Sequence, residues 1–338
     1  MKLLVTGGAG FIGSCLVRRL LAPELRSLVG EVVVLDKFTY AGHRANLDSV
    51  MDDRRLTVVV GDIGDARLVD QLMANVDRVM NLAAETHVDR SIEDALNFID
   101  ANVRGTYVVL DAARRHNVEY FLQMSTDEVY GVPEPGYRSR EADTLAPRNP
   151  YAASKASAEL LCHAFKETFG LPIVIARSSN NVGPHQHIEK LVPRFTTNAL
   201  RGLSLPLHGD GKQQRDWLYV EDHCEALTTI LTDGEIGSIY NVGARQEHTV
   251  EQVADVILDE LGGTVSLVHV DDRLGNDRRY AIDTSRVEAL GWSPHHDFEQ
   301  AIRKTVGWYR DNEDWWRPLV ESEPAQGGFI GAPKKGAA

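Results

Sequence analysis

Apolar runs of strand length alternate with stretches of helical spacing over the first half of the chain. The runs are KLLVT at 2–6, EVVVLD at 31–36, LTVVVGD at 56–62, RVMNLAA at 78–84, YFLQMS at 120–125 and PIVIAR at 172–177. Strands that are apolar on both sides are typical of a parallel sheet covered by helices. The pattern therefore predicts an α/β fold with a doubly wound parallel sheet.

The spacing of apolar residues changes beyond Ser178, where segments punctuated by Pro and Gly replace the regular alternation. Another apolar run, SIYNVG at 238–243, follows them. We interpret this as a second, smaller α/β domain interleaved with the first. The predicted boundaries are 1–177 for the larger domain with a returning segment near 218–243, 178–217 and 244–322 for the smaller domain, and 323–338 for a flexible tail.

Composition narrows the class of protein. The 36 Lys and Arg against 49 Asp and Glu give a net charge of -13, which opposes nucleic-acid binding. The chain opens with a strand rather than a signal peptide, and no apolar stretch approaches the roughly 20 residues that span a membrane. Cys15, Cys162 and Cys224 show no CxxC spacing. We expect a soluble, cytoplasmic protein with no membrane or nucleic-acid partner.

Glycines recur at three-residue intervals directly after the first apolar run, as Gly7, Gly10 and Gly13 in TGGAGFIG. The next residues, SCLVRRLL, have the apolar spacing of a helix. Glycines here permit a tight turn, let the main chain approach a pyrophosphate, and pack the helix against the strand, while the helix N-terminus offers free N–H donors. The pattern indicates a Rossmann-type, dinucleotide-binding domain.

Asp36 ends the second apolar run, about 20 residues after the glycines, where an acid bonds the hydroxyls of the adenosine ribose. Its charge would repel a 2′-phosphate, which favours NAD over NADP, although neighbouring Lys37 could accommodate that phosphate. Asp62 closes the third run. Its position fits either the adenine edge or an ordinary turn or helix cap, and the sequence leaves both readings open.

A helix is predicted between Pro150 and Gly170, with Asn149 as its cap. Tyr151 and Lys155 are four residues apart and share one face of it. We expect the ammonium to lower the pKa of the phenol and to reach the nicotinamide ribose, so that the phenolate can take a proton from an alcohol. The alternative is an amphipathic helix with a chance Tyr and Lys on its wet face.

Five features taken together resemble a known family: TGGAGFIG, Asp36, LAAETHVDRS, STDEVYG and YAASK. They resemble the extended short-chain dehydrogenase/reductase family, and within it the dTDP-glucose 4,6-dehydratases, over nearly the whole chain. The resemblance implies a hydro-lyase of deoxysugar biosynthesis with a Rossmann-type domain, tightly held NAD and a C-terminal nucleotide-sugar domain. It also implies a homodimer formed through helices near 92–115 and 151–169.

STDEVYG is the most specific of these segments, because relatives that only epimerise the sugar at C4 lack the acids Asp127 and Glu128. Side chains of a strand alternate between faces, so both acids can serve one pocket only if the strand ends near Ser125. On the following turn, their closeness favours one neutral and one ionised carboxyl, which is what removal of water demands. A solvated turn is the alternative reading.

The predicted reaction has three steps. Tyr151, helped by Lys155 and by a hydrogen bond from Thr126, takes the C4 hydroxyl proton while hydride passes from C4 to NAD. Glu128 then removes the C5 proton while Asp127 protonates the departing C6 hydroxyl. Hydride returns to C6 and Glu128 returns a proton to C5, which gives dTDP-4-keto-6-deoxyglucose and regenerates NAD.

The resemblance assigns further residues to the two ligands. The cofactor set is Gly7, Gly10, Phe11, Ile12, Gly13, Asp36, Lys37, Thr39, Asp62, Ile63, Ala83, Ala84, Tyr151, Lys155 and Asn181. The substrate set is Thr86, Thr126, Asn180, Lys190, Leu191, Pro206, Leu207, Arg215, Arg273 and Asn276. Fixed cations in the second set suit a diphosphate, since Arg can grip it in a bidentate manner.

The chain departs from the family in RLGND, where the family usually has RPGHD, so Leu274 and Asn276 replace Pro and His. Asn276 can still donate a hydrogen bond but carries no charge. NVGARQE likewise differs from the commoner NIGGHNE, which bears on the ribose contacts of that loop. His185 and His187 have no third ligand at a recognisable spacing, so we predict no metal site.

Three alternatives remain. A UDP-sugar 4-epimerase or decarboxylase shares the fold, a GDP-mannose 4,6-dehydratase shares the chemistry but generally uses NADP, and a sensor could bind NAD without catalysis. The pair Asp127 and Glu128 opposes the first, Asp36 opposes the second, and the intact catalytic set opposes the third. The sequence does not identify the nucleotide base or the pathway that uses the product.

Overall fold

The structure is a computed structural model that describes residues 1–263, 265–272 and 276–322. Its largest element is a seven-stranded parallel sheet in the order β10-β6-β5-β4-β1-β2-β3. The strands are β1 (Lys2–Thr6), β2 (Glu31–Asp36), β3 (Leu56–Val60), β4 (Arg78–Asn81), β5 (Tyr120–Thr126), β6 (Ile173–Ser178) and β10 (Ile239–Val242). Each contains a predicted apolar run or most of one, and the predicted α/β fold with a doubly wound, Rossmann-type sheet is confirmed.

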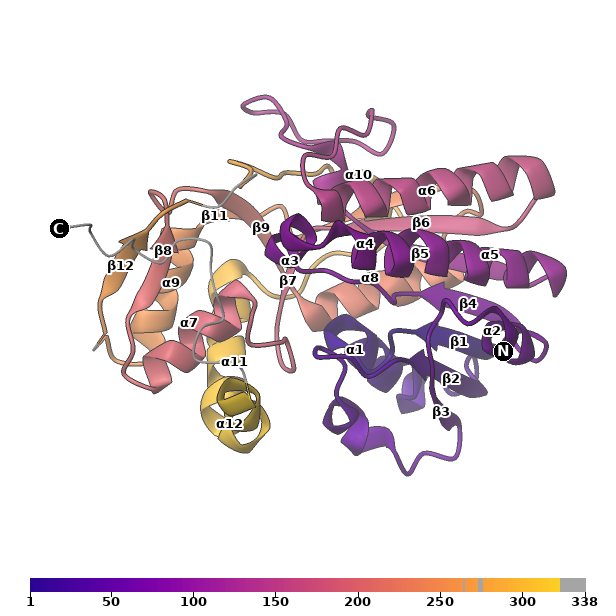
Figure 1. Ribbon diagram of the computed structural model, residues 1–338, viewed down its shortest axis with the longest axis horizontal. Coiled ribbons are helices and arrows are strands. Elements are labelled where there is room, and N and C mark those ends of the chain that lie inside the picture. Colours follow the sequence, from indigo (N-terminus) through magenta and orange to yellow (C-terminus); the bar gives the residue numbers. More distant parts are fainter. Residues whose placement is uncertain (264, 273–275, 323–338) are drawn as a thin grey trace.

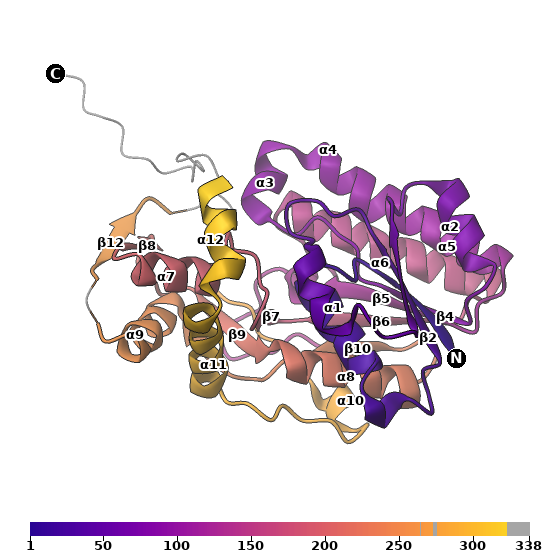
Figure 2. The ribbon, with the colours of Figure 1, turned by 90° about the horizontal axis from the view of Figure 1, so that it is seen from below.

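Helices cover both faces of this sheet (Figure 1 and Figure 2). One face carries α1 (Phe11–Leu20) and α8 (Val220–Asp233), and the other carries α2 (Ala66–Met73), α5 (Thr106–Arg115) and α6 (Pro150–Phe169). Within β1, Leu3 and Val5 join the core on the first face, whereas Leu4 joins the core on the second. Burial on both faces explains why the strands are apolar at nearly every position.

The strand order reverses direction at β1, which pairs with β2 on one side and with β4 on the other. In open parallel sheets this reversal leaves a crevice beyond the carboxyl ends of the strands, where ligands bind. The glycine-rich turn follows β1 directly, at Gly7–Gly10. The fold therefore brings the predicted cofactor turn to the crevice.

A smaller lobe lies beside the crevice, at the left in Figure 1 and Figure 2. It contains a three-stranded sheet, β11-β9-β7, and a two-stranded sheet, β12-β8. Its elements are β7 (Asn180–Val182), α7 (Leu191–Leu200), β8 (Leu205–His208), β9 (Gln214–Tyr219), β11 (Glu247–Thr249), α9 (Val250–Glu260), β12 (Leu267–Val270), α11 (Phe298–Asp311) and α12 (Glu313–Ser322). The chain leaves the smaller lobe at α8, returns to the large sheet through β10, and then enters the lobe again.

Short elements complete the described chain. They are the 3-10 turns η1 (Pro23–Leu25), η2 (Arg44–Val50) and η4 (Asp127–Tyr130), the π-helical segment η3 (Ile99–Gly105), and the helices α3 (Val88–Glu93), α4 (Ala95–Phe98) and α10 (Ser285–Glu288). Across the described ranges, none of the helices combines the length and the apolar character that a membrane crossing requires. The tail predicted at 323–338 lies outside the described residues.

Candidate active site

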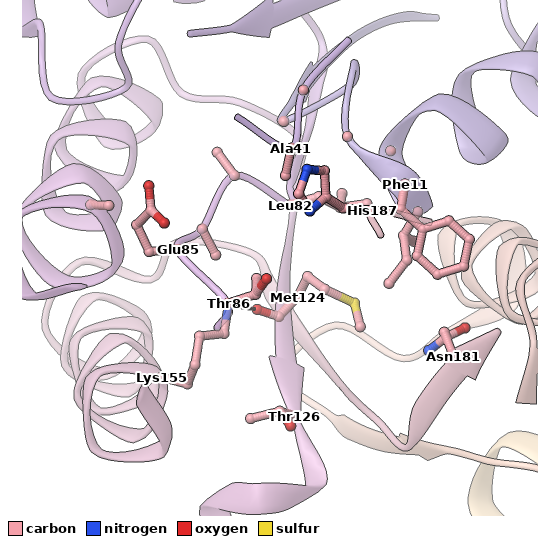
Figure 3. Close-up of a pocket in the computed structure, with 18 of the residues that line it drawn as sticks. Phe11, Ala41, Leu82, Glu85, Thr86, Met124, Thr126, Lys155, Asn181 and His187 are labelled. Carbon is pink, nitrogen blue, oxygen red and sulfur yellow. Dashed lines mark hydrogen bonds between the residues drawn. The ribbon is translucent and has the colours of Figure 1, made fainter. Parts of the chain in front are cut away.

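A cavity of roughly 340 Å³ opens at the carboxyl ends of the parallel strands. Figure 3 shows Phe11 and His187 in the upper part of the view, Thr126 at the end of β5 in the lower part, Met124 between them and Lys155 to the left. All predicted cofactor residues and all predicted catalytic residues line it. The structure thus gathers residues that lie as far apart in the sequence as 7 and 190.

The glycine turn leaves no room for side chains. A Cβ atom added to Gly13 would lie 2.0 Å from the carbonyl oxygen of Gly7, and one added to Gly7 would lie 2.8 Å from Cα of Ala83. Gly7 also has φ of 68°, in the left-handed region that glycine adopts without strain. Gly10 caps α1 without a side-chain hydrogen bond, so the helix N-terminus keeps its N–H groups and partial positive charge for an anion.

Asp36 ends β2 at the rim of the cavity and is 9% exposed. Its Oδ2 accepts a hydrogen bond from the main-chain N–H of Ala9 at 2.9 Å, and its Oδ1 accepts one from Phe38 at 2.8 Å. Each carboxylate oxygen retains a lone pair, so the group can also accept from two adjacent ribose hydroxyls. Asp36 is therefore fixed by the glycine turn in a position where it can bind the adenosine ribose.

Lys37 and Asp62 form an ion pair of 2.7 Å at the same rim. Asp62 also accepts from the main-chain N–H of Gly64 at 2.7 Å, so the turn role left open by the sequence is present. Partial burial raises the pKa of Asp62, but the bonds from Lys37 and Gly64 outweigh it and lower the pKa overall. The Lys37 cation is thus already paired with a carboxylate, which makes it less suited to bind a 2′-phosphate.

Tyr151 and Lys155 lie on α6, which begins at Pro150 as predicted. The helix is capped by Asn149, whose side chain accepts from Ala152 N at 2.8 Å, and it ends at Gly170 in the left-handed conformation. Both side chains are buried and line the cavity. The one-face arrangement predicted from their spacing is confirmed.

The predicted effect of Lys155 on the phenol is not found. Burial raises the pKa of Tyr151, the charge of Glu128 raises it further, and only the hydrogen bond with Thr126 lowers it. The Lys155 ammonium instead donates to the carbonyl oxygen of Met124 at 2.6 Å, and burial lowers its own pKa to about 8. The sequence prediction failed here because helical spacing fixes the shared face but not the partner that a long side chain selects.

The acid pair follows β5, which ends at Thr126, close to the predicted end near Ser125. Asp127 and Glu128 then begin the 3-10 turn η4, so both carboxyls escape the alternation of a strand and line one cavity. Thr126 accepts from the main-chain N–H of Glu128 at 3.3 Å and donates to Oδ1 of Asp127 at 3.3 Å. The hydroxyl of Thr126 therefore fixes the turn that carries both acids.

The two acids have different surroundings. Asp127 is 3% exposed, and its Oδ2 has no hydrogen-bond partner among the described residues. Burial raises the pKa of Asp127, and the charges of Glu128 and Asp216 raise it further. Burial also raises the pKa of Glu128, whose Oε2 accepts from Asn149 Nδ2 at 3.0 Å. A protonated Asp127 beside a hydrogen-bonded Glu128 is an acid and a base in one pocket.

Further polar atoms on the cavity wall are buried without a partner among the described residues. They include Oγ of Ser125, Oγ of Ser179 and Oδ1 of Asn181. Buried polar atoms normally find a hydrogen bond, so unpaired ones on a cavity wall suit a polar ligand. Together with the glycine turn and Asp36, they fit a dinucleotide with its polar nicotinamide end near Lys155.

The predicted substrate residues divide into two groups. Thr86, Thr126, Asn180 and Lys190 line the cavity, and Lys190 Nζ donates to the carbonyl oxygen of Thr86 at 2.9 Å. Five residues belong to the smaller lobe and are not part of that wall, namely Leu191, Pro206, Leu207, Arg215 and Asn276. The side chain of Leu207 is fully buried in the core of this lobe. Arg273 and Leu274 lie outside the described residues.

Arg215 and Asn276 are nevertheless linked to the acid pair through Tyr280. Arg215 Nη2 donates to Oδ1 of Asn276 at 3.3 Å and to the carbonyl oxygen of Asp277 at 2.8 Å, and its guanidinium lies 4.3 Å from the ring centre of Tyr280. The hydroxyl of Tyr280 reaches Glu128. Sequence reasoning missed Tyr280 and Asp277, because 152 residues separate Tyr280 from Glu128 and no local pattern joins them.

The two histidines of PHQH pack against aromatic rings. The ring of His185 lies 4.6 Å from that of Trp308, and the ring of His187 lies 5.2 Å from that of Tyr40. Burial lowers the pKa of His185 to about 4 and that of His187 to about 3. Among the residues described, no cluster of three or more His, Cys, Asp or Glu is arranged to hold a metal ion.

Comparisons with known proteins agree with this site. Residues 4–305 match the family described as GDP-mannose 4,6 dehydratase. A dTDP-glucose 4,6-dehydratase of Streptomyces antibioticus is 49% identical over 94% of this chain and 95% of its own. The low-salt glycan biosynthesis protein Agl12 of Haloferax volcanii is 48% identical over 93% of this chain and 100% of its own. The crystal structure of DesIV, a dTDP-glucose 4,6-dehydratase from Streptomyces venezuelae with NAD bound, superposes with a TM-score of 0.92 at 46% identity, covering 94% of this chain and 100% of that one.

Proposed function

The chain belongs to the GDP-mannose 4,6 dehydratase family, and on that premise we propose that it is an NAD-dependent dTDP-glucose 4,6-dehydratase. The enzyme is a hydro-lyase that converts dTDP-glucose to dTDP-4-keto-6-deoxyglucose. The observation that carries the proposal is the acid pair, buried Asp127 and partly buried Glu128, on the same cavity as Tyr151 and the glycine turn. DesIV, a 4,6-dehydratase of known structure, is crystallised with NAD, which supports NAD as the cofactor.

Oxidation at C4 is the task of Tyr151. When bound, NAD supplies the acceptor for the hydride that leaves C4 and the donor that returns it to C6. Tyr151 takes the C4 hydroxyl proton, and the hydroxyl of Thr126, which lowers the pKa of the phenol, can turn from Asp127 to donate to the phenolate that starts the step. Lys155 is held by Met124 at the same wall, where its ammonium can bond the ribose next to the nicotinamide.

Elimination of water is the task of the acid pair. A ketone at C4 makes the C5 hydrogen acidic, and Glu128 removes it as base. Asp127, whose pKa burial raises, is the neutral acid that protonates the departing C6 hydroxyl. Two adjacent carboxyls in unequal surroundings can take these opposite roles at one pH. After hydride has returned to C6, Glu128 gives a proton back to C5.

The nucleotide diphosphate is assigned to the smaller lobe. Lys190 lies on the cavity, and Arg215 lies beside Tyr280 at the edge of the acid pair. Cations so placed suit the two phosphates of a nucleotide sugar, with Arg273 as a further candidate. The proposed division of labour is cofactor binding by 1–177 and sugar-nucleotide binding by 178–217 and 244–322.

We assign the protein to the cytoplasm as a homodimer. Apolar side chains are exposed on four helical elements that contact one another, namely Leu96 on α4, Ile99 on η3, Tyr107 on α5 and both Leu160 and Phe169 on α6. An exposed apolar surface that spans several helices suits a two-fold interface. The three cysteines are free, as expected in a reducing compartment.

The proposal is tested by incubating the purified protein separately with dTDP-glucose, UDP-glucose and GDP-mannose and measuring product mass. We expect a product lighter by one water from dTDP-glucose, with its turnover at least tenfold faster than for the other two. An isomer of unchanged mass would identify an epimerase, and loss of carbon dioxide in a further incubation with UDP-glucuronic acid would identify a decarboxylase. No reaction with any of these sugars would favour an NAD-binding sensor.

A further inference from the structure

Tyr280 lies between the acid pair and the protein surface. Its hydroxyl is 3.4 Å from Oε2 of Glu128 and 2.6 Å from Oδ2 of Asp277. A phenol carries one proton, so the shorter contact takes it and Asp277 is the acceptor. The Tyr280 oxygen therefore keeps a lone pair that can receive a proton from Glu128.

Asp277 connects this hydroxyl to solvent. The residue is only 3% exposed, but its Oδ1 lies 3.2 Å from Nη1 of Arg148, whose side chain is 57% exposed. Asp277 therefore contacts a side chain that itself extends into solvent. Three groups in line, Glu128, Tyr280 and Asp277, thus lead from the cavity to the surface.

Within the described part of the chain, no other hydrogen-bond partner of Glu128 offers such a route. Oε2 accepts from the amide of Asn149, which cannot take up a proton, and the amide oxygen of Asn149 is already the cap of α6. Asp127 bonds only Thr126 among the described residues and faces the cavity. A sugar bound in the cavity would separate both acids from water on that side.

We propose that Tyr280 and Asp277 form a proton relay through which Glu128 exchanges the proton taken from C5 with solvent while the sugar is still bound. The inference rests on the proposed function. Arg215 holds the relay in place, because it stacks on the ring of Tyr280 at 4.3 Å and donates to the carbonyl oxygen of Asp277 at 2.8 Å.

The relay balances protons and leaves the chemistry at C4 and C6 unchanged. Glu128, carrying the C5 proton, gives it to the Tyr280 oxygen as the phenol proton moves to Asp277. Asp277 then exchanges that proton with water, and a solvent proton returns by the same path. Burial raises the pKa of Tyr280, as do the charges of Glu128 and Asp277, so the phenol passes a proton without remaining ionised.

The origin of the hydrogen at C5 tests this relay. Wild type, Tyr280→Phe and Asp277→Asn are incubated with dTDP-glucose in D2O for short times. The ketone is reduced at once with borohydride, because the C5 hydrogen next to it also exchanges without enzyme. We expect solvent deuterium at C5 in most wild-type product and at least fivefold less in either variant, with turnover reduced by less than tenfold.

Asp210→Asn is the matched control. Its carboxylate holds Arg278 at 2.7 and 2.8 Å, next to Asp277 in the sequence, but does not contact Tyr280, so its product should match wild type. Two variants are used so that misfolding of one leaves the other to decide, with folding followed by circular dichroism and bound NAD.

Three results would overturn the relay: wild-type product without deuterium at C5, variant product as deuterated as wild type, or loss of dehydration by more than a hundredfold in both folded variants. The last would place Tyr280 and Asp277 in the elimination itself. Failure of wild type to dehydrate dTDP-glucose would instead reject the proposed function on which the relay rests.

Discussion

At the glycine end of the cavity, which we define as Gly7–Gly13 with Asp36, the ligand-facing groups are main-chain amides and a carboxylate whose two oxygens both accept main-chain N–H bonds. At the acid end, which we define as Thr126, Asp127 and Glu128, they are side chains. Contacts there are longer, from 3.0 to 3.4 Å, and one carboxylate oxygen has no partner among the described residues.

The difference reflects what each end has to do. A cofactor that is held throughout the reaction needs fixed donors, and main chain in a tight turn supplies them without side-chain freedom. Proton transfer needs groups that change charge, and burial raises the pKa of both acids toward such a change. A site of this kind is less stable than a fully paired one, because buried polar atoms without partners cost free energy.

The largest effect is expected from the acid end. Asp127→Asn together with Glu128→Gln removes both the acid and the base while keeping the shape of the side chains. Each group contributes about 10²- to 10⁴-fold, so dehydration should fall by at least ~10⁴-fold. Oxidation at C4 should persist, because Tyr151 and Thr126 are intact, and reduced nicotinamide should accumulate in a single-turnover absorbance trace.

Bound NAD and the thermal midpoint provide the control for this double variant. Bound NAD should stay close to wild type, since neither acid contacts the glycine turn, and the thermal midpoint should not fall. Dehydration within tenfold of wild type would remove Asp127 and Glu128 from their proposed roles.

A substitution in the glycine turn should weaken NAD binding rather than slow dehydration. In Gly13→Ala the new Cβ would lie 2.0 Å from the carbonyl oxygen of Gly7, so α1 has to shift away from the turn. A displacement of this size costs about 100-fold in NAD affinity and about 1–3 kcal/mol in stability. Calorimetric titration of NAD and thermal unfolding measure the two effects.

Gly307→Ala is the matched control within a helix. Its Cβ would meet nothing closer than 3.7 Å, so NAD affinity should be unchanged and stability should rise slightly. Equal NAD affinity in Gly13→Ala and wild type would show that the turn does not need its third glycine.

The two ends also differ in how far the sequence predicts them. The glycine end is local: strand, turn and helix are contiguous, and the spacing of Gly7, Gly10 and Gly13 states the geometry. The same holds for α6, whose cap and last residue were predicted from Asn149 and Gly170. The apolar runs likewise predicted every strand of the large sheet, because all but the edge strand β3 are largely buried on both faces.

The acid end depends on tertiary structure. Its turn was predicted from the argument that Asp127 and Glu128 had to leave the strand. The partners of Glu128 were not predicted, because Tyr280 reaches it only after the smaller lobe has folded beside the sheet. The pKa of Tyr151 was predicted in the wrong direction, since burial is set by packing rather than by helical spacing.

The free-energy cost of burying the Asp127 carboxyl can be measured through the pH dependence of stability. Folding raises the pKa of Asp127 above its ordinary value of 3.8, so the native state binds more protons than the unfolded state above that pH. Stability therefore falls as pH rises from about 4 through the raised pKa. Asp127→Asn cannot ionise and should be more stable than wild type by about 1–3 kcal/mol at pH 7, with no gain near pH 4.

Urea unfolding of the two proteins at pH 4 and pH 7 measures this gain. Asp53→Asn is a control of opposite sign, because Arg55 lowers the pKa of Asp53. Its loss should destabilise the protein at both pH 7 and pH 4, since this contribution disappears only as pH falls from about 3.8 through the lowered pKa. A gain for Asp127→Asn that is equal at both pH values would mean that charge burial is not its cause.

The smallest effect is expected from a substitution of Thr126, the residue that holds the acid-pair turn and also acts on Tyr151. Thr126→Val keeps the shape of the side chain but removes the hydroxyl that bonds Asp127 and the main-chain N–H of Glu128 and that lowers the pKa of Tyr151. A neutral hydrogen bond is worth about 0.5–1.5 kcal/mol, so oxidation at C4 should slow by about tenfold. Stopped-flow traces of reduced nicotinamide measure this step separately from elimination.

Thr126→Ser restores the hydroxyl and should recover most of the rate, whereas equal rates in Thr126→Val and wild type would mean that the phenolate forms without help from this residue.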